Sequence, residues 1–135
     1  MSARYMLDTD TCIYLRKRRP PKVAERFGTL QQGEVVMSLV TYGELRNGAL
    51  KSSAPDAALA NLQRLGELLP VQAMPVNAAD HYSEIRSALE KSGQIIGGND
   101  LWIAAHALAL DVTLVTNNIG EFSRIPQLKL ENWLD

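Results

Sequence analysis

The sequence has few of the features that mark secreted, membrane-spanning or disordered proteins. Cys12 is its only cysteine, so a disulfide within the chain is impossible and the reducing cytoplasm is the expected compartment. The longest apolar run, residues 101–110, is interrupted by His106 and is too short to cross a bilayer. No charged segment followed by an apolar one opens the chain, so we expect no signal peptide. We therefore expect a cytoplasmic protein that makes no contact with a membrane.

A strong net charge is also absent. The formal charge is -1 over 135 residues, so charge alone does not indicate a protein that binds nucleic acid. The segment RKRRPPK nevertheless gathers five basic residues, namely Arg16, Lys17, Arg18, Arg19 and Lys22. Such a cluster can bind phosphates. It also fits a solvated helix end that is stopped by two prolines, and the segment alone favours this simpler interpretation.

Length and composition fit one domain. The chain is 46% hydrophobic and 21% charged, a balance that is typical of globular proteins and sufficient to bury a core. A chain of this length leaves little room for a second core. We predict that residues 1–135 form a single domain.

Short apolar segments alternate with helical patterns along the chain. We expect strands at residues 4–7, 34–37, 71–74, 113–115 and 128–130. We expect helices at residues 9–18, 23–30, 39–50, 55–68, 77–91 and 99–110, and a helical turn near Gly120. The helix at 99–110 is apolar nearly all round, which predicts that it is buried. This alternation predicts an α/β fold in which a central, mostly parallel sheet is flanked by helices.

Polar side chains follow the predicted strands. Asp8 follows the first strand, Glu44 lies early in the helix after the second, Asp100 opens the buried helix and Asn118 follows the fourth strand. Ligands of parallel sheets bind outside the carboxyl ends of the strands. We therefore expect these four residues to converge on one cleft.

Each of these residues also has a purely structural explanation. Asp8 can cap the first helix, and Glu44 can reach back to a backbone donor in a capping box. Asp100 is favourable in the first turn of a helix, and Asn118 suits a turn. Together, however, these explanations leave several acids beside an apolar helix, and a buried carboxylate is costly unless it is paired or binds a cation. A hard divalent cation with oxygen ligands is the economical partner.

The string DTDT at residues 8–11 resembles the first motif of the haloacid dehalogenase-like phosphatases. In that family the first aspartate, here Asp8, accepts the phosphoryl group, and the second, here Asp10, is a general acid. The segment GGND resembles part of the last acidic motif of that family. The expected lysine is misplaced, because Lys91 lies only nine positions before Asp100, and Glu44 has no role in that chemistry. The phosphatase remains an alternative interpretation.

A second resemblance extends over residues 5–134. The segments MLDTDTCIYL, SLVTYGEL, GGNDLWIAAHALAL, LVTNNIGEF and LENWL occur in the order that is found in PIN-domain ribonucleases. More narrowly, the chain is similar to the VapC toxins of bacterial type II toxin–antitoxin systems. The resemblance implies a PIN-like fold and an endoribonuclease that depends on Mg²⁺ or Mn²⁺. The subgroup that the chain most resembles cuts initiator tRNA in the anticodon region.

The same resemblance implies partners. VapC-type proteins usually form homodimers and are silenced by a cognate VapB antitoxin. The C-terminal tail of the antitoxin enters the active-site groove, while its N-terminal domain binds operator DNA. We therefore expect contact with operator DNA only through the antitoxin.

The resemblance also implies roles for the acids. Asp8, Glu44 and Asp100 match the acidic residues that hold the metal and carry out catalysis. Asp100 or Glu44 is expected to orient or deprotonate the attacking water, and the products carry a 5′-phosphate and a 3′-hydroxyl. No protein nucleophile is needed, in keeping with the lack of a Ser-His or Cys-His pattern. A catalytically inactive PIN-like RNA-binding module is a further alternative, against which the intact set of acids argues.

Four further residues match supporting positions, namely Asp10, Asn99, Thr116 and Asn118. Asn118 falls where many PIN domains have a fourth acid, and an amide brings no charge. We therefore expect one well-held metal ion and a second that is recruited by the RNA phosphate. Next to such a cleft the basic segment gains weight as a surface that holds RNA. His106 and Cys12 are expected in the core, the histidine hydrogen-bonded, and Trp102 and Trp133 in packing or interface positions.

Overall fold

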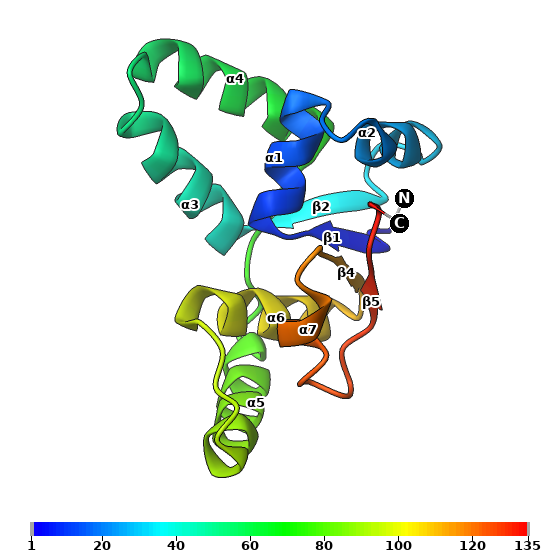
Figure 1. The fold of residues 1–135 in the computed structure, drawn as a ribbon, viewed down its shortest axis with the longest axis vertical. Coiled ribbons are helices and arrows are strands. Elements are labelled where there is room, and N and C mark those ends of the chain that lie inside the picture. The colour runs from blue at the N-terminus through cyan, green and yellow to red at the C-terminus, as the bar shows by residue number, and fades with distance from the viewer. Residues whose placement is uncertain (1, 135) are drawn as a thin grey trace.

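A five-stranded sheet lies at the centre of the computed structural model, which describes residues 2–134 (Figure 1). Its strands are β1 (Tyr5–Leu7), β2 (Val35–Ser38), β3 (Val71–Gln72), β4 (Thr113–Val115) and β5 (Leu130–Glu131). They lie in the order β3-β2-β1-β4-β5, and every neighbouring pair is parallel. The predicted α/β fold with a parallel sheet is confirmed. Because β1 is the central strand, residues that follow it lie in the middle of the carboxyl edge.

Seven helices cover the two faces of the sheet within residues 2–134. They are α1 (Thr9–Lys17), α2 (Pro21–Gly28), α3 (Leu39–Leu50), α4 (Pro55–Leu68), α5 (Ala78–Ser92), α6 (Gly98–Leu110) and α7 (Ile119–Phe122). Figure 1 shows α1 to α4 on one side of the sheet and α5, α6 and α7 on the other. None of these helices is long and apolar enough to cross a membrane, as far as residues 2–134 are concerned.

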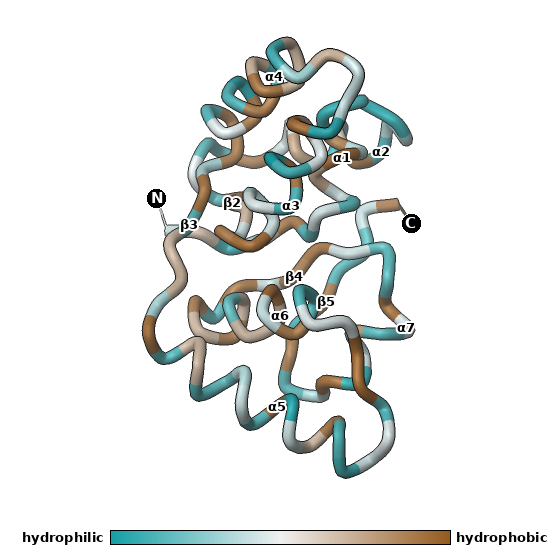
Figure 2. Tube along the Cα trace, turned by 90° about the vertical axis from the view of Figure 1, so that its left-hand side faces the viewer, coloured by the Kyte–Doolittle hydropathy of each residue, from teal (hydrophilic) through white to brown (hydrophobic). Residues whose placement is uncertain are grey.

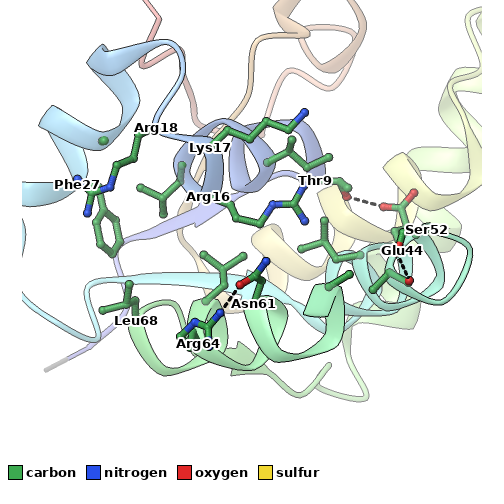
Figure 3. Close-up of a pocket in the computed structure, with 18 of the residues that line it drawn as sticks. Thr9, Arg16, Lys17, Arg18, Phe27, Glu44, Ser52, Asn61, Arg64 and Leu68 are labelled. Atoms are coloured by element: carbon green, nitrogen blue, oxygen red, sulfur yellow. Dashed lines mark hydrogen bonds between the residues drawn. The ribbon is translucent and has the colours of Figure 1, made fainter. Parts of the chain in front are cut away.

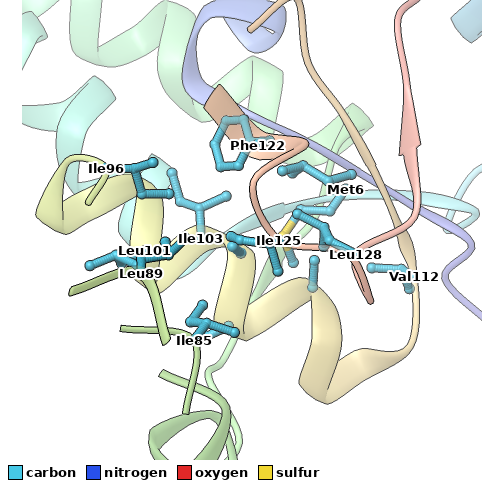
Figure 4. Packing of buried hydrophobic residues seen from close by; sticks show 14 of the residues in the cluster. Met6, Ile85, Leu89, Ile96, Leu101, Ile103, Val112, Phe122, Ile125 and Leu128 are labelled. Atoms are coloured by element: carbon cyan, nitrogen blue, oxygen red, sulfur yellow. The ribbon is translucent and has the colours of Figure 1, made fainter. Parts of the chain in front are cut away.

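The two faces of the sheet bury two separate hydrophobic clusters, because side chains alternate between faces along a strand. In β1, Met6 joins the cluster with α5, α6 and α7, whereas Tyr5 and Leu7 join the cluster with α1 to α4. Figure 4 shows the first cluster, in which Leu101 and Ile103 of α6 pack among side chains of α5 and α7. Figure 2 shows hydrophobic residues concentrated in the inner strands and α6, and mixed with hydrophilic ones along α4 and α5. The prediction that the helix at 99–110 is buried is confirmed.

Several predicted boundaries were wrong by one or a few residues. The second helix begins at Pro21 instead of residue 23, because proline is favourable in a first helical turn, where its missing N–H is not needed. The strand β3 ends at Gln72 instead of residue 74, and the carbonyl of Ala73 accepts a hydrogen bond from His106 instead of from a strand. The edge strand expected at 128–130 begins only at Leu130.

The residues predicted to lie in the core do so. Cys12 is fully buried, and His106 is fully buried with both ring nitrogens in hydrogen-bonding contacts. Trp133 is buried and meets the ring of Tyr5 edge to face at 5.6 Å between centroids. Trp102 stacks on a tyrosine of α5 at 3.8 Å between centroids. The two tryptophans therefore serve packing within the chain.

The buried face of β4 gives a test of this core. Replacement Leu114→Ala is expected to lower the free energy of unfolding by about 2–5 kcal/mol, because Leu114 is fully buried and the cavity cannot close completely. Urea unfolding followed by circular dichroism measures the loss. The control Val76→Ala, at a side chain that is 93% exposed, is expected to change it by less than about 0.5 kcal/mol. Similar losses in both variants would contradict the placement of Leu114.

Candidate active site

Asp8 lies at the carboxyl end of the central strand and also caps helix α1. Its Oδ1 accepts a hydrogen bond from the backbone N–H of Thr11 at 2.9 Å, and its Oδ2 accepts one from Thr116 Oγ1 at 2.6 Å. The residue is only 7% exposed. Burial raises the pKa of the Asp8 carboxyl above its usual value, although the hydrogen bonds from Thr11 and Thr116 act in the opposite direction. Capping therefore explains the position of Asp8 but not the burial of its charge.

Glu44 reaches across the cleft from the second turn of α3. Its Oε1 accepts a hydrogen bond from Thr9 Oγ1 at 2.5 Å, which Figure 3 shows, and its Oε2 accepts one from Asn99 Nδ2 at 3.2 Å. The carboxylate thus connects the first turns of α1 and α6. The alternative of a capping box is wrong, because α3 begins earlier and is capped by Ser38, whose Oγ accepts from the N–H of Val40.

Asp100 lies half-buried in the first turn of α6. Burial is the largest cause that raises its pKa, to about 6, followed by the close Glu121 carboxylate and then by the charges of Glu44 and Asp8. Four acids from four separate parts of the chain therefore act on one another at this edge of the sheet.

Glu121 is the acid that the sequence analysis missed. It lies on α7, one turn after Asn118, whose Nδ2 donates to its Oε2 at 2.6 Å, while the backbone N–H of Gly97 donates to its Oε1 at 3.3 Å. Burial acts to raise the pKa of Glu121, but these two hydrogen bonds outweigh it and the pKa lies below its usual value. Asn118 therefore supports Glu121 and is not itself the fourth acid of the cluster. The signal was present in NNIGEF, where an acid follows Asn118 at the spacing of one helical turn.

The other predicted supporting residues divide into two kinds. Asn99 donates to Glu44, and Thr116 donates to Asp8 while its Oγ1 accepts from the backbone N–H of Asn118 at 2.9 Å. Asp10, by contrast, is exposed, and within residues 2–134 no hydrogen bond joins it to the four acids. Its charge acts only weakly on Asp8, as the last of the causes that raise the pKa there.

The four acids have no cationic partner among the described residues. The ion pairs of residues 2–134 involve other acids, at positions 34, 90, 111 and 131. Arg124 lowers the pKa of Glu121 by its charge, but its guanidinium donates to two backbone carbonyls of the loop before α6. Carboxylates that lack a protein cation and supply only oxygen ligands fit a hard divalent cation.

The arrangement suits a partly hydrated ion better than a closed cage. Among residues 2–134, no three His, Cys, Asp or Glu side chains already surround one point at ligand distances. Mg²⁺ commonly keeps several waters and binds through one or two carboxylates, so it does not need such a cage. The donor set of Asp8, Glu44, Asp100 and Glu121 is compatible with that mode of binding.

A groove with a volume of ≈ 870 Å³ adjoins the acids and runs between α1, α2, α3 and α4 (Figure 3). Thr9 and Glu44 lie at its acidic end. Its other walls are apolar, with Leu15, Phe27, Leu45, Leu65 and Leu68 among them, and basic, with Arg16, Lys17, Arg18 and Arg64. Arg19 and Lys22 of the basic segment are exposed but do not line this groove, and Lys22 borders a smaller hollow beside the chain end.

Comparison with known proteins gives consistent matches over nearly the whole chain. Residues 5–128 match the PIN domain family. The chain is 42% identical to ribonuclease VapC1 of Haemophilus influenzae over 130 residues, which cover 96% of this chain and 97% of the relative. It is 39% identical to the tRNA(fMet)-specific endonuclease VapC of Salmonella typhimurium, over 96% and 98% of the two chains. A crystal structure of DNA-bound VapBC from Salmonella typhimurium shares 38% identity and superposes with a TM-score of 0.91 over 97% and 98% of the chains.

The mutual repulsion of the acids gives a test in metal-free protein. The pKa of Asp100 is about 6 in the folded chain and 3.8 in the unfolded one, so the folded state binds more protons between these values. Stability therefore falls as the pH rises from 3.8 to 6, and the full penalty is present at pH 7. Asp100→Asn removes it, and after allowance for solvent screening at a half-buried site we expect a gain of about 1 kcal/mol at pH 7.

Urea unfolding in EDTA at pH 5 and pH 7 measures this effect. The control Asp80→Asn, at an exposed position in the first turn of α5, is expected to show no comparable gain. A variant Asp100→Asn that is less stable than the parent at pH 7 in EDTA would contradict a raised pKa of Asp100.

Proposed function

Because the chain belongs to the PIN-domain family and is closely similar to VapC ribonucleases, we propose that it is a metal-dependent endoribonuclease that acts as the toxin of a VapBC-type pair. The observation that carries this proposal is the convergence of Asp8, Glu44, Asp100 and Glu121 at the carboxyl edge of the sheet without a protein cation. The PIN-domain match is at odds with the alternative of a haloacid dehalogenase-like phosphatase.

The proposed cofactor is Mg²⁺ or Mn²⁺, held by Asp8, Glu44, Asp100 and Glu121 partly through water. When bound, such an ion lowers the pKa of a coordinated water and stabilises the negative charge that develops on the scissile phosphate. The acids themselves are held in place by neighbouring donors. Thr116 and the N–H of Thr11 fix Asp8, and comparable donors from α1 and α6 fix Glu44. Such outer hydrogen bonds orient ligands before the metal and the substrate arrive.

Asp100 is the acid best suited to accept a proton from the attacking water. A general base works best when its pKa lies near the working pH, and in the metal-free chain burial, followed by the neighbouring acids, raises the pKa of Asp100 to about 6. Water adds to the phosphorus and its proton passes to the Asp100 carboxylate, while the bond to the 3′ oxygen breaks and that oxygen takes up a proton from solvent. The products carry a 5′-phosphate and a 3′-hydroxyl. Glu121, with its lowered pKa, stays ionised throughout.

The proposed substrate is a tRNA, cut in a loop, and the proposed site of action is the cytoplasm. The similarity to a tRNA(fMet)-specific endonuclease supports initiator tRNA as the first candidate. Arg16, Lys17 and Arg18 lie along the groove that leads to Glu44, where they can hold the phosphates on either side of a splayed loop. Arg19 and Lys22 lie outside the groove and are proposed to contact RNA farther from the cut.

The first test is cleavage of initiator tRNA by the purified chain with Mg²⁺. Asp8→Asn and Asp100→Asn are each expected to lower the cleavage rate by about 10³-fold or more, because a ligand and a proton acceptor are lost. EDTA is expected to abolish cleavage by the parent chain. The control Asp80→Asn is expected to keep the parental rate, and mapping of new 5′ ends identifies the cut.

Two outcomes would contradict the proposal. Equal cleavage by the parent and by Asp100→Asn would show that the activity does not come from this site. Tight binding of tRNA by the folded parent without any metal-dependent cleavage would instead indicate a catalytically inactive RNA-binding module.

The proposed partner is a VapB-type antitoxin whose C-terminal tail fills the groove. A groove with apolar walls and an acidic end suits a segment that carries apolar side chains along its length and a basic one at its tip. Leu68 is 55% exposed at the wall of the groove, where such a segment would cover it. The antitoxin would also supply contact with operator DNA, and the similar VapBC of Salmonella typhimurium is known in a DNA-bound crystal structure. The resemblance to VapC proteins further supports a homodimer of the toxin.

Replacement of Leu68 is expected to weaken inhibition by the antitoxin without slowing catalysis. Leu68→Asp is expected to weaken binding of the antitoxin tail at least about tenfold, since it places a charge in an apolar contact. The cleavage rate in the absence of antitoxin is expected to change little, because Leu68 lies away from the acids. Fluorescence anisotropy with a labelled peptide of the tail measures the affinity. Val76→Asp, outside the groove, is the control, and equal weakening by both variants would place the tail elsewhere.

A further inference from the structure

A buried polar contact joins the start of α3 to α6, away from the four acids. His106 of α6 is fully buried, with Nδ1 2.8 Å from Ser38 Oγ and Nε2 3.1 Å from the carbonyl oxygen of Ala73. Ser38 is also fully buried and caps α3. Among the described residues of α6, His106 is the only polar side chain that is buried.

The hydrogen bonds define which nitrogen carries the proton. The carbonyl of Ala73 can only accept, so the hydrogen lies on Nε2. Ser38 Oγ already accepts from the N–H of Val40 at 3.1 Å, which leaves the hydroxyl hydrogen free to donate to Nδ1. Every donor and acceptor is then satisfied by a neutral imidazole. Burial lowers the pKa of His106, which favours this neutral form.

His106 adds directed contacts to the apolar packing of α6. The helix buries Ile103, Ala104, Ala105 and Ala107, and apolar contacts have no preferred direction. The two hydrogen bonds of the His106 ring, to Ser38 and to Ala73, define both the position of α6 along its axis and its rotation about that axis.

The same two helices meet a second time at the acids. The contact between Glu44 and Asn99 lies six residues beyond Ser38 on α3 and seven residues before His106 on α6. At a rise of 1.5 Å per residue, these separations are about 9 Å and about 10.5 Å. The chain runs from Ser38 to Glu44 and from Asn99 to His106, so the two contacts join these segments in opposite chain directions. The contact between His106 and Ser38 therefore sets where along α3 and α6 the acids face each other.

We infer that His106 is a positioning residue, which through its hydrogen bond with Ser38 sets the register of α3 against α6 and so the placement of Glu44 opposite Asp100. The inference rests on the proposed function, because the value of that placement is to bind a divalent cation and to orient water on a phosphate. A displacement of about 1 Å at such a site is sufficient to lower a rate about 100-fold.

The test combines Mn²⁺ titration of the metal-free chain with RNA cleavage. His106→Phe keeps a ring of similar size and removes both hydrogen bonds, and Ser38→Ala removes the partner. Each is expected to weaken Mn²⁺ binding about tenfold and to lower kcat about 10–100-fold. KM for the RNA is expected to stay within about threefold, because the basic groove is not altered. The double variant is expected to be no worse than the more damaged single variant, since both remove the same contact.

Two further variants separate positioning from loss of stability. Ile103→Val trims a buried side chain on the same helix without touching a hydrogen bond, and is expected to keep Mn²⁺ affinity and kcat. His106→Asn keeps an acceptor for Ser38 and is expected to recover part of both. All variants are assayed well below their Tm, and Ser38→Ala carries the test if His106→Phe does not fold.

The outcomes are distinct. Parental Mn²⁺ affinity and kcat in both His106→Phe and Ser38→Ala would overturn the inference, and so would equal losses in Ile103→Val. If the parent chain binds Mn²⁺ but cuts no RNA, the proposed function fails, and the Mn²⁺ titrations alone decide the role of His106. If the parent binds no Mn²⁺, both proposals fall.

Discussion

The two hydrogen bonds that hold the Asp8 carboxylate determine how the centre of the molecule is built. One comes from the first turn of α1 and the other from Thr116, directly after β4, so a single side chain joins the central strand, its helix and the neighbouring strand. Both donors favour the charged form, whereas burial opposes it. The carboxylate is thus fixed by two hydrogen bonds in surroundings that disfavour its charge. Such a conflict between local stability and charge is expected where function requires the group.

A similar conflict arises at Asp100 and Glu121, and its strength differs between them. Glu121 has enough donors to stay ionised, whereas Asp100 bears most of the repulsion and is the first of the pair to take up a proton. Two neighbouring carboxyls whose pKa values are driven apart suit different tasks, one as a fixed negative ligand and the other as a proton acceptor. The difference between the two pKa values comes from hydrogen-bond donors outside the four acids, because Asn118 Nδ2 and the backbone N–H of Gly97 donate to Glu121 alone.

Local sequence patterns predicted those features that depend on interactions between residues close together in the sequence. The long helices and the inner strands follow from hydrophobic periodicity, and the parallel sheet follows from their alternation, so the edge carrying Asp8 and Asp100 was predictable. The capping box of Glu44 failed because Ser38, farther back in the sequence, already caps the helix. Glu121 was missed because α7 is a single turn, and only tertiary packing brings it to Asp100. The early end of β3 likewise depends on His106, which is distant in sequence.

The position of the groove gives the proposed toxin a simple means of inhibition. One end of the groove is formed by Glu44 and its donor Thr9, and the walls beyond it combine apolar side chains with Arg16 and Arg64. In the proposed function, RNA binds the basic residues and the acids, whereas an inhibitory tail binds the apolar walls and the acidic end. The two ligands therefore overlap at the acids but draw affinity from different parts of the groove. A tail can block the site by occupancy alone, with no change of fold, and substitutions in the apolar wall can tune inhibition without altering catalysis.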